Sequence, residues 1–241
     1  SHVTENFRKV RTNLDYYPLE SKCRVIITTS TVPGEGKTFI AINTADIYAM
    51  SGKKVLLVDF DLRKPRLEKC LDLDNEFGLS TILTNRKTWQ ECLHKDVVEN
   101  MDVITSGPLT PIAAELLIGK NIDTFISEVR NEYDIVILDT PPLGIIHDAI
   151  TLSKYADNFF YVMRSGISVK GYIEYINGIV EEHGLKNVSM ILNGLPASKH
   201  SSYGYSKYGY SNYGKYGYTE DEDDDNTGKG NFFSRLFGKK N

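Results

Sequence analysis

The sequence predicts an α/β fold in which helices cover both faces of a parallel sheet, followed by a disordered C-terminal tail. Short apolar runs alternate with segments whose apolar residues recur at helical spacing. This alternation is typical of buried parallel strands joined by crossover helices. From residue 198 onward, more than thirty positions contain no aliphatic side chain. Such a composition is typical of segments that cannot form a packed core.

Six strands are expected from the apolar runs, which are bounded by polar loops. The stretches "VLLVD" and "IVILD" contain no polar residue before their final aspartate. Continuous apolar runs of this kind predict strands that are buried on both faces. In chain order, the expected strands cover residues 23–30, 54–61, 100–107, 133–142, 158–166 and 186–194.

Four helices are expected around these strands. Phe7, Val10 and Leu14 lie on one helical face of the first segment, and Gly52 closes the second helix. The stretch from residue 62 to residue 99 is less regular. In chain order, the expected helices cover residues 5–16, 36–54, 113–130 and 168–184.

The length and composition of the chain fit one domain followed by a tail. The chain has 241 residues and a hydrophobic share of 41%, and two full domains would leave each core small. Its net charge of −4 argues against nucleic acid as the main partner, because binding to phosphates requires a basic surplus. The three cysteines are far apart and form no metal-binding spacing, so we expect ordinary thiols.

A glycine-rich loop, "TVPGEGKT", follows the first expected strand and precedes a helix. It matches the phosphate-binding P-loop pattern G-x-x-x-x-G-K-[ST], except that Thr31 stands in place of the first glycine. Lys37 supplies positive charge to the β- and γ-phosphates, and the Thr38 hydroxyl can bind Mg²⁺. The alternative is a glycine turn with an incidental lysine. The predicted nucleotide-binding residues are Pro33, Gly34, Glu35, Gly36, Lys37, Thr38 and Phe39.

Three aspartates end two of the buried strands. Asp59 and Asp61 stand in "VLLVDFDLR", and Asp139 stands in "VILDTPP". An aspartate that ends a buried strand beside a phosphate-binding loop is the Walker B arrangement, which holds Mg²⁺ directly or through water. Alternatively, any one of these aspartates caps the helix that follows it. Together with Lys37, they are the candidate catalytic residues.

These residues resemble those of a known family, the bacterial tyrosine kinases (BY-kinases) of capsule and exopolysaccharide export. "TSTVPGEGKT" is similar to the family's Walker A motif, "VLLVDFDLRKP" to its additional A′ motif and "VILDTPP" to its Walker B motif. "ENFRKVR" matches the family's E-x-x-R-x-x-R helix through Glu5, Arg8 and Arg11. The resemblance runs from Glu5 to about Gly194 and includes the tyrosine-rich tail. Single motifs occur in other P-loop ATPases, but all of them in this order are specific.

The resemblance implies an ATP- and Mg-dependent protein-tyrosine autokinase. Lys37 and the loop amides would bind the ATP phosphates, while Thr38, Asp61 and Asp139 would organise Mg²⁺. Asp59 would orient the attacking tyrosine hydroxyl or accept its proton. Chemistry alone does not decide between Asp59 and Asp61, because a carboxylate beside Mg²⁺ is a weak base for a phenol whose pKa is about 10.

The tail carries the expected substrate. Residues 202–225 read "SYGYSKYGYSNYGKYGYTEDEDDD", and the glycines and serines leave the tyrosines free to reach the catalytic site of the next subunit. We expect unmodified tails to help close a ring and phosphorylation to release them, because each phosphate adds roughly −1.5 to −2 charges beside an acidic run. The alternative is a low-complexity sticker region. The expected autophosphorylation sites are Tyr203, Tyr205, Tyr208, Tyr210, Tyr213, Tyr216 and Tyr218.

The resemblance also implies partners and a location. Residues 1–18 would form an oligomerisation helix, with Ser1 and His2 a tag scar, ahead of a kinase domain at 19–197 and the tail at 198–241. In the family this helix contributes to subunit contacts in a ring; alternatively, it is a solvated face with charge pairs. Further expected partners are a transmembrane co-polymerase or activator, fused or separate, and a cognate tyrosine phosphatase. The expected location is the inner face of the bacterial plasma membrane.

A rival interpretation is a ParA/MinD-type positioning ATPase, which hydrolyses ATP without phosphorylating protein. Such proteins usually carry a second lysine five residues before the P-loop lysine, and Val32 stands at that position here. A membrane contact of the basic-aromatic end "NFFSRLFGKK" would suit this class. A third interpretation is a scaffold that binds nucleotide without turnover. The kinase and the ATPase differ in where the γ-phosphate goes.

Overall fold

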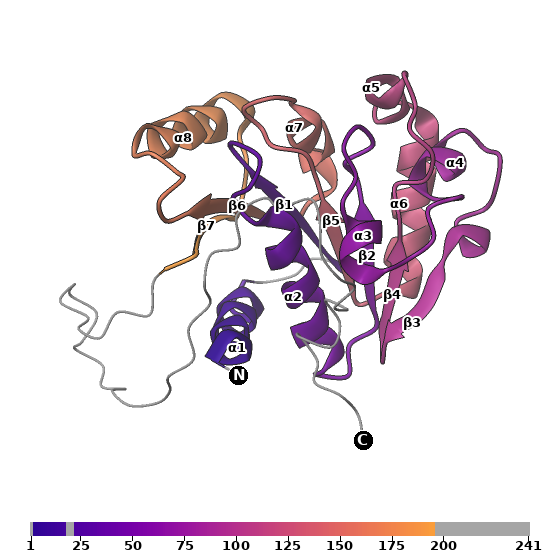
Figure 1. Cartoon of the computed structure of the whole chain (residues 1–241), viewed down its shortest axis with the longest axis horizontal. Coiled ribbons are helices and arrows are strands. Elements are labelled where there is room, and N and C mark those ends of the chain that lie inside the picture. Colours follow the sequence, from indigo (N-terminus) through magenta and orange to yellow (C-terminus); the bar gives the residue numbers. More distant parts are fainter. Residues whose placement is uncertain (1, 18–21, 196–241) are drawn as a thin grey trace, which may run out of the picture.

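In the computed structural model, which describes residues 2–17 and 22–195, seven strands form a single sheet in the order β3-β4-β2-β5-β1-β6-β7. All neighbouring strands run parallel except β3, which pairs antiparallel with β4. Figure 1 shows the helices packed around this sheet. The strands are β1 (Arg24–Ser30), β2 (Val55–Asp59), β3 (His94–Val98), β4 (Met101–Ile104), β5 (Ile135–Asp139), β6 (Asn158–Arg164) and β7 (Val188–Asn193).

The helices vary widely in length. The two short 3₁₀ helices are η1 (Gln90–Cys92) and η2 (Ser153–Tyr155). The α-helices are α1 (His2–Asp15), α2 (Lys37–Ala49), α3 (Leu67–Leu71), α4 (Leu79–Leu83), α5 (Ala113–Leu116), α6 (Lys120–Glu132), α7 (Asp148–Leu152) and α8 (Gly171–His183).

The strands alternate between two apolar layers. Val25 and Ile27 of β1 pack with side chains from α4 to α8, whereas Ile26 packs with side chains from α1, α2 and α3. The side chains of a strand point alternately to opposite faces, so both faces of the sheet must be covered. The runs without polar residues are explained by this double burial.

Helix α1 is packed onto the rest of the protein. The ring of Phe7 makes an edge-to-face contact with Phe39 of α2, with the centroids 6.1 Å apart. Arg11 donates a hydrogen bond to the carbonyl oxygen of Ile47 at 3.1 Å. Phe7 and Leu14 are buried in the same apolar layer as α2. The predicted apolar face of the first helix is therefore confirmed.

The predicted α/β fold and all six predicted strands are confirmed. The sheet is not wholly parallel, because β3 adds an antiparallel edge that the sequence did not predict. Its sequence "HKDVV" has no buried face, so it gave no periodic signal. The helix expected over residues 113–130 is two helices, since Gly119 before α6 has extended backbone angles. Helices α3, α4 and α7 were also missed, and each is only five residues long.

The predicted tail, with its tyrosine cluster, lies outside the described residues. Within residues 2–17 and 22–195, no helix is both long and apolar enough to cross a membrane.

Asp46 on α2 provides a test of the packing. Burial raises the pKa of its carboxyl to about 6, and its Oδ1 accepts no hydrogen bond from the described residues. The unfolded chain therefore ionises first, and this group lowers the free energy of unfolding as pH rises from about 4 to about 6. Asp46→Asn should raise that free energy by on the order of 1 kcal/mol at pH 7.5, allowing for partial exposure, and change little at pH 4.

Urea denaturation at the two pH values measures this difference. Glu181→Gln, which alters an exposed carboxylate on α8, is the control and should shift stability by less than about 0.5 kcal/mol. A variant at position 46 that is equally stabilised at both pH values would contradict the burial argument.

Candidate active site

The predicted site residues gather at one edge of the sheet. Strands β2, β5 and β1 are adjacent and parallel, so their carboxyl ends and the loops that follow lie together (Figure 1). Asp59 at the end of β2 pairs in register with Asp139 at the end of β5. Asp139 in turn pairs with Thr28 of β1, the strand that leads into the glycine-rich loop. Sites at such an edge are typical of open α/β sheets.

The glycine-rich loop takes the backbone conformation that a phosphate-binding loop needs. Gly34 and Gly36 have φ angles of 87° and 93°, a region that side chains other than glycine rarely enter. A Cβ at Gly36 would also lie 2.2 Å from the Nδ2 atom of Asn193. Helix α2 begins at the next residue, Lys37. The positive end of the helix therefore faces the inside of the loop.

The Glu35 side chain shapes this loop from within. It is fully buried, and its Oε2 accepts hydrogen bonds from the backbone N–H groups of Thr31 and Val32, both at 2.8 Å. Its Oε1 accepts a hydrogen bond from the hydroxyl of Ser168, in the loop after β6. Glu35 was predicted to bind nucleotide, but its side chain is used inside the protein. Only its backbone can face a phosphate.

Phe39, also predicted to bind nucleotide, directs its ring toward Phe7 of α1. Thr38 is buried and donates a hydrogen bond from its hydroxyl to Oδ2 of Asp139 at 2.6 Å. Lys37 is half-buried, and Pro33 is exposed at the tip of the loop. The structure thus brings Thr38 and Asp139 into direct contact, as a Walker A and Walker B pair requires.

The surroundings of Asp139 favour a bound cation. It is 2% exposed, and its Oδ1 has no hydrogen-bond partner among the described residues. Burial raises the pKa of its carboxyl, Lys37 and the Thr38 hydroxyl lower it, and Asp61 raises it further. These four predicted residues therefore lie within electrostatic reach of one another. A buried carboxylate oxygen without a partner is costly unless a positive group meets it.

Asp59 and Asp61 differ in depth. Asp59 is 0% exposed, and its two oxygens accept hydrogen bonds from the backbone N–H groups of Asp61, at 3.0 Å, and Leu67, at 3.3 Å. Burial, followed by the nearby charge of Asp139, raises its pKa well above the ordinary value. Asp61 is 8% exposed and accepts the N–H of Lys64 at 2.9 Å through Oδ1. Its Oδ2 accepts no hydrogen bond from the described residues.

The site fits Mg²⁺ bound together with a nucleotide. In the described part of the chain, no three His, Cys, Asp or Glu side chains form a metal cluster. Mg²⁺ prefers one or two carboxylates together with phosphate oxygens and water, so a complete protein cage is not needed. The unpartnered Oδ1 of Asp139 and the adjacent hydroxyl of Thr38 supply the expected oxygen atoms.

Three residues that support the loop were missed. Besides Ser168, Asn193 at the end of β7 donates to the Glu35 carbonyl at 3.1 Å, and Arg164 at the end of β6 donates to the Gly34 carbonyl at 3.1 Å. All three follow the loop by more than 120 positions in the chain. No local pattern in the sequence marks them, because their role depends on strand order.

The helix motif of Glu5, Arg8 and Arg11 lies on α1, outside this carboxylate cluster. Glu5 and Arg8 form an exposed ion pair at 3.2 Å, and Arg11 contacts α2 of the same chain. Their predicted role in subunit contacts stays a prediction.

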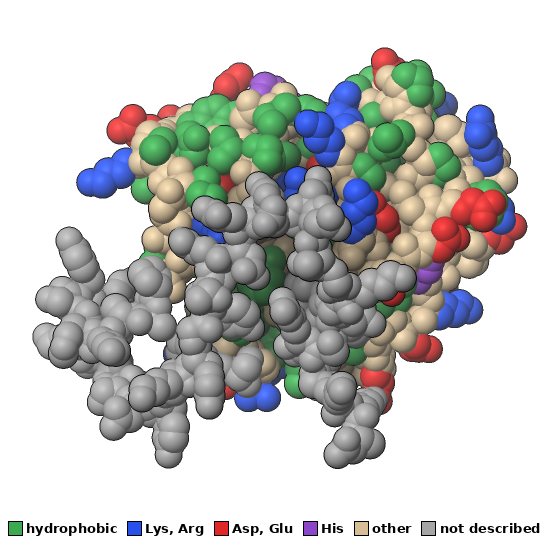
Figure 2. Space-filling model, viewed as in Figure 1, with side chains coloured by type: hydrophobic (Ala, Val, Ile, Leu, Met, Phe, Trp, Pro, Cys, Tyr) green, Lys and Arg blue, Asp and Glu red, His purple; other side chains and the backbone are tan. Residues whose placement is uncertain are grey.

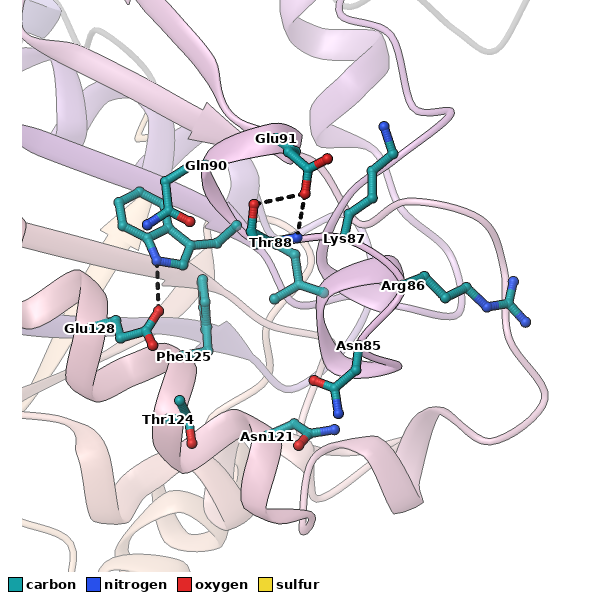
Figure 3. Close-up of a pocket in the computed structure, with 12 residues that line it drawn as sticks. Asn85, Arg86, Lys87, Thr88, Gln90, Glu91, Asn121, Thr124, Phe125 and Glu128 are labelled. Atoms are coloured by element: carbon teal, nitrogen blue, oxygen red, sulfur yellow. Dashed lines mark hydrogen bonds between the residues drawn. The ribbon is translucent and has the colours of Figure 1, made fainter.

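A separate hollow of about 500 Å³ opens between α6 and the segment after α4 (Figure 3). Trp89 donates its indole N–H to Glu128 across it at 2.9 Å, and Glu91 accepts two hydrogen bonds from Thr88. None of the predicted site residues lines it. Because the glycine-rich loop contributes nothing to its lining, this hollow is not the predicted phosphate site.

Comparisons with known proteins identify the family of the chain. The family model of the AAA domain matches residues 23–184. Tyrosine-protein kinase YwqD of Bacillus subtilis (strain 168) is 37% identical over 202 residues, covering 84% of this chain and 85% of YwqD. Putative tyrosine-protein kinase CapB of Staphylococcus aureus is 32% identical, covering 85% of this chain and 90% of CapB.

A solved structure gives the same result. The kinase domain of Escherichia coli tyrosine kinase ETK matches with a TM-score of 0.76 at 31% identity, covering 84% of this chain and 80% of that chain. The fold and site thus define a nucleotide-binding α/β domain of the AAA type. The chain belongs to the bacterial tyrosine-protein kinases, which confirms the resemblance seen in the sequence.

The buried Glu35 leads to a prediction about the loop. Glu35→Ala leaves the N–H groups of Thr31 and Val32 without their acceptor, at a cost of about 1–3 kcal/mol for the buried Thr31 group and less for the half-buried Val32 group. We expect stability to fall by about 2–4 kcal/mol and the affinity for a fluorescent ADP analogue to fall at least about tenfold. Urea denaturation and fluorescence titration measure the two effects.

Glu91→Ala is the matched control, because Glu91 also accepts two hydrogen bonds but is exposed and lies outside the site. It should change stability by less than about 1 kcal/mol and leave nucleotide affinity unchanged. A folded Glu35→Ala protein with normal nucleotide affinity would show that the side chain does not shape the loop.

Proposed function

We propose that this protein transfers the γ-phosphate of ATP to the tyrosines of its own C-terminal tail, Tyr203 to Tyr218. The observation that carries the proposal is the contact of Thr38 with a buried Asp139 that retains an unpartnered oxygen, in a member of the bacterial tyrosine kinases. The same chain supplies seven tyrosines within sixteen residues, immediately before an acidic run.

The chain's own residues divide the work at the site. The backbone N–H groups of the loop and the ammonium group of Lys37 bind and orient the phosphates. Thr38, Asp61 and Asp139 are the residues that would hold Mg²⁺. When bound, Mg²⁺ neutralises charge on the phosphate oxygens. Because phosphoryl transfer needs positioning more than covalent help from the protein, a preformed loop is the main contribution.

In the reaction, the tyrosine oxygen forms a bond to the γ-phosphorus while the bond from that phosphorus to the bridging oxygen of ADP breaks. The phenolic proton leaves to a carboxylate or to water. The family resemblance gives the orienting role to Asp59, which is fully buried with both oxygens bonded to backbone N–H groups. Asp61 is less deeply buried and is the better placed of the two to touch the hydroxyl. Asp59 then acts by holding the loop that carries Asp61.

The fate of the γ-phosphate tests the kinase proposal. After incubation with Mg-ATP, intact-mass and peptide mass spectrometry should find phosphate on residues 203–218 of the native chain. Lys37→Met should lower this incorporation by at least about 100-fold, since the variant loses the charge that faces the phosphates.

Two results would contradict the proposal. Free phosphate released beside an unmodified tail would favour a positioning ATPase of the ParA/MinD type. Tail phosphorylation that persists in Lys37→Met would point to a contaminating kinase. Since a membrane activator is among the expected partners, the assay is run with and without a membrane fraction. The Lys37→Met protein with the same fraction reports any kinase that the membranes contain.

Regulation follows from the same proposal. The tails act in trans between subunits of a ring, to which α1 contributes the exposed Glu5 and Arg8, and phosphorylation opens the ring. The protein then works at the inner face of the plasma membrane, beside a transmembrane activator and a tyrosine phosphatase, in the control of capsule or exopolysaccharide synthesis and export. The exposed ion pair on α1 is worth little within one chain, so its charges are available for a neighbour.

Light scattering tests the ring. The unphosphorylated protein should form an oligomer, and the fully phosphorylated protein should be a monomer, because roughly −10 to −14 added charges repel neighbouring tails. Arg8→Ala should weaken assembly at least about tenfold without changing the unfolding midpoint, whereas Lys9→Ala on the same helix is the control. An unchanged mass after full phosphorylation would refute the release step.

A further inference from the structure

A basic groove lies beside the candidate active site. It is a hollow of about 720 Å³ whose lining includes Arg63, Lys64, Arg66, Lys69 and Leu109. The lining begins two residues after Asp61, in the segment that follows β2. Figure 2 shows Lys and Arg side chains gathered on this face, around α3 and the loop before it. We call this feature the basic groove.

The charge of the basic groove is largely unpaired. Within residues 2–17 and 22–195, Lys64, Arg66 and Lys69 form no salt bridge, and all three are exposed. Arg63 lies 3.8 Å from Asp148, which partly neutralises it. Glu68 is the one carboxylate in the lining. Exposed cations that repel one another without internal partners suit an anionic ligand.

The groove is fixed to the catalytic edge by backbone hydrogen bonds. Asp61 accepts the N–H of Lys64 at 2.9 Å, and Asp59 accepts the N–H of Leu67 at 3.3 Å. Leu67 is fully buried at the start of α3. A ligand held in the groove is therefore held at a defined place relative to both aspartates.

The geometry points to one occupant, and this inference rests on the proposed function. We propose that the basic groove binds the acidic run Glu220–Asp225 of the C-terminal tail and so holds the tyrosines before it at the active site. The run has six consecutive carboxylates and begins two residues after Tyr218. An extended chain advances about 3.3–3.6 Å per residue, so Tyr218 would lie about 7 Å from the first carboxylate. That short spacing would let the run contact the groove while Tyr218 stays near the catalytic edge, because Lys64 of the groove donates its N–H to Asp61.

A peptide supplied in trans tests the proposal with binding and catalysis as separate readouts. The peptide spans residues 200–227 with a fluorescent label, and its control carries Gln and Asn in place of the six acidic residues. The protein is the full chain with its own acidic run neutralised in the same way, so that its tail does not compete. The groove variant is Arg66→Gln/Lys69→Gln, and the matched control is Lys53→Gln/Lys95→Gln, two exposed lysines away from the groove.

Fluorescence anisotropy should show the acidic peptide binding at least about tenfold more tightly than the neutral peptide, with the difference lost between about 50 and 300 mM salt. The groove variant should lose this preference, and the lysine control should keep it. In phosphorylation assays, the groove variant should raise KM for the acidic peptide about tenfold and leave kcat within about twofold.

Equal affinity for the acidic and neutral peptides overturns the inference, and this comparison stands even if the groove variant fails to fold. A groove variant that loses binding to phosphatidylserine vesicles but keeps the preference for the acidic peptide also overturns the inference. The groove would then bind a membrane surface. Groove-dependent peptide binding without any tyrosine phosphorylation refutes the proposed kinase function and leaves the binding site standing. Tyrosine phosphorylation that depends neither on the charges of the groove nor on those of the peptide refutes the groove inference and leaves the proposed kinase function standing.

Discussion

The parallel pairing of β2 with β5 constrains everything else at the catalytic edge. It sets Asp59 opposite Asp139 inside the sheet, where they are 0% and 2% exposed. Burial raises the pKa of both carboxyls, and a neighbouring carboxylate raises each further, Asp139 for Asp59 and Asp61 for Asp139. The ionised pair is therefore unfavourable in the absence of a compensating cation. The protein keeps this arrangement because phosphoryl transfer needs oxygen ligands and fixed charge at one place.

Other residues of the site compensate for the buried carboxyl of Asp139. Lys37 lowers the pKa of Asp139, and the Thr38 hydroxyl bonds to it. The loop that presents both residues is held from within by Glu35 and from outside by Asn193 at the end of β7. A phosphate-binding loop is thus built from elements that span almost the whole folded chain, and α1 packs against the helix that follows it.

The parts of this arrangement that could be predicted were those carried by local patterns. Strands β2 and β5 are buried on both faces, and unbroken apolar runs in the sequence predict this. Gly34 and Gly36 have positive φ angles, and a glycine-rich loop in the sequence predicts them. The contacts of Ser168 and Asn193 depend on strand order, which the sequence does not display. The use of Glu35 as an internal acceptor was hidden for another reason: a glutamate in a loop ordinarily faces water. The edge strand β3 gave no signal because its side chains are not buried in alternation.

Asp139 destabilises the protein without ligand and contributes to the nucleotide site. The Asp139→Asn substitution tests this claim most directly. The measurement is the free energy of unfolding with and without Mg-ADP. Without ligand, the variant should be more stable than the native protein by on the order of 1 kcal/mol, since a buried charge is removed while Thr38 keeps an acceptor. With ligand at a hundred times the native Kd, it should lose most of the roughly 2.7 kcal/mol that binding contributes. A variant that is less stable without ligand, yet fully stabilised by Mg-ADP, would contradict the account.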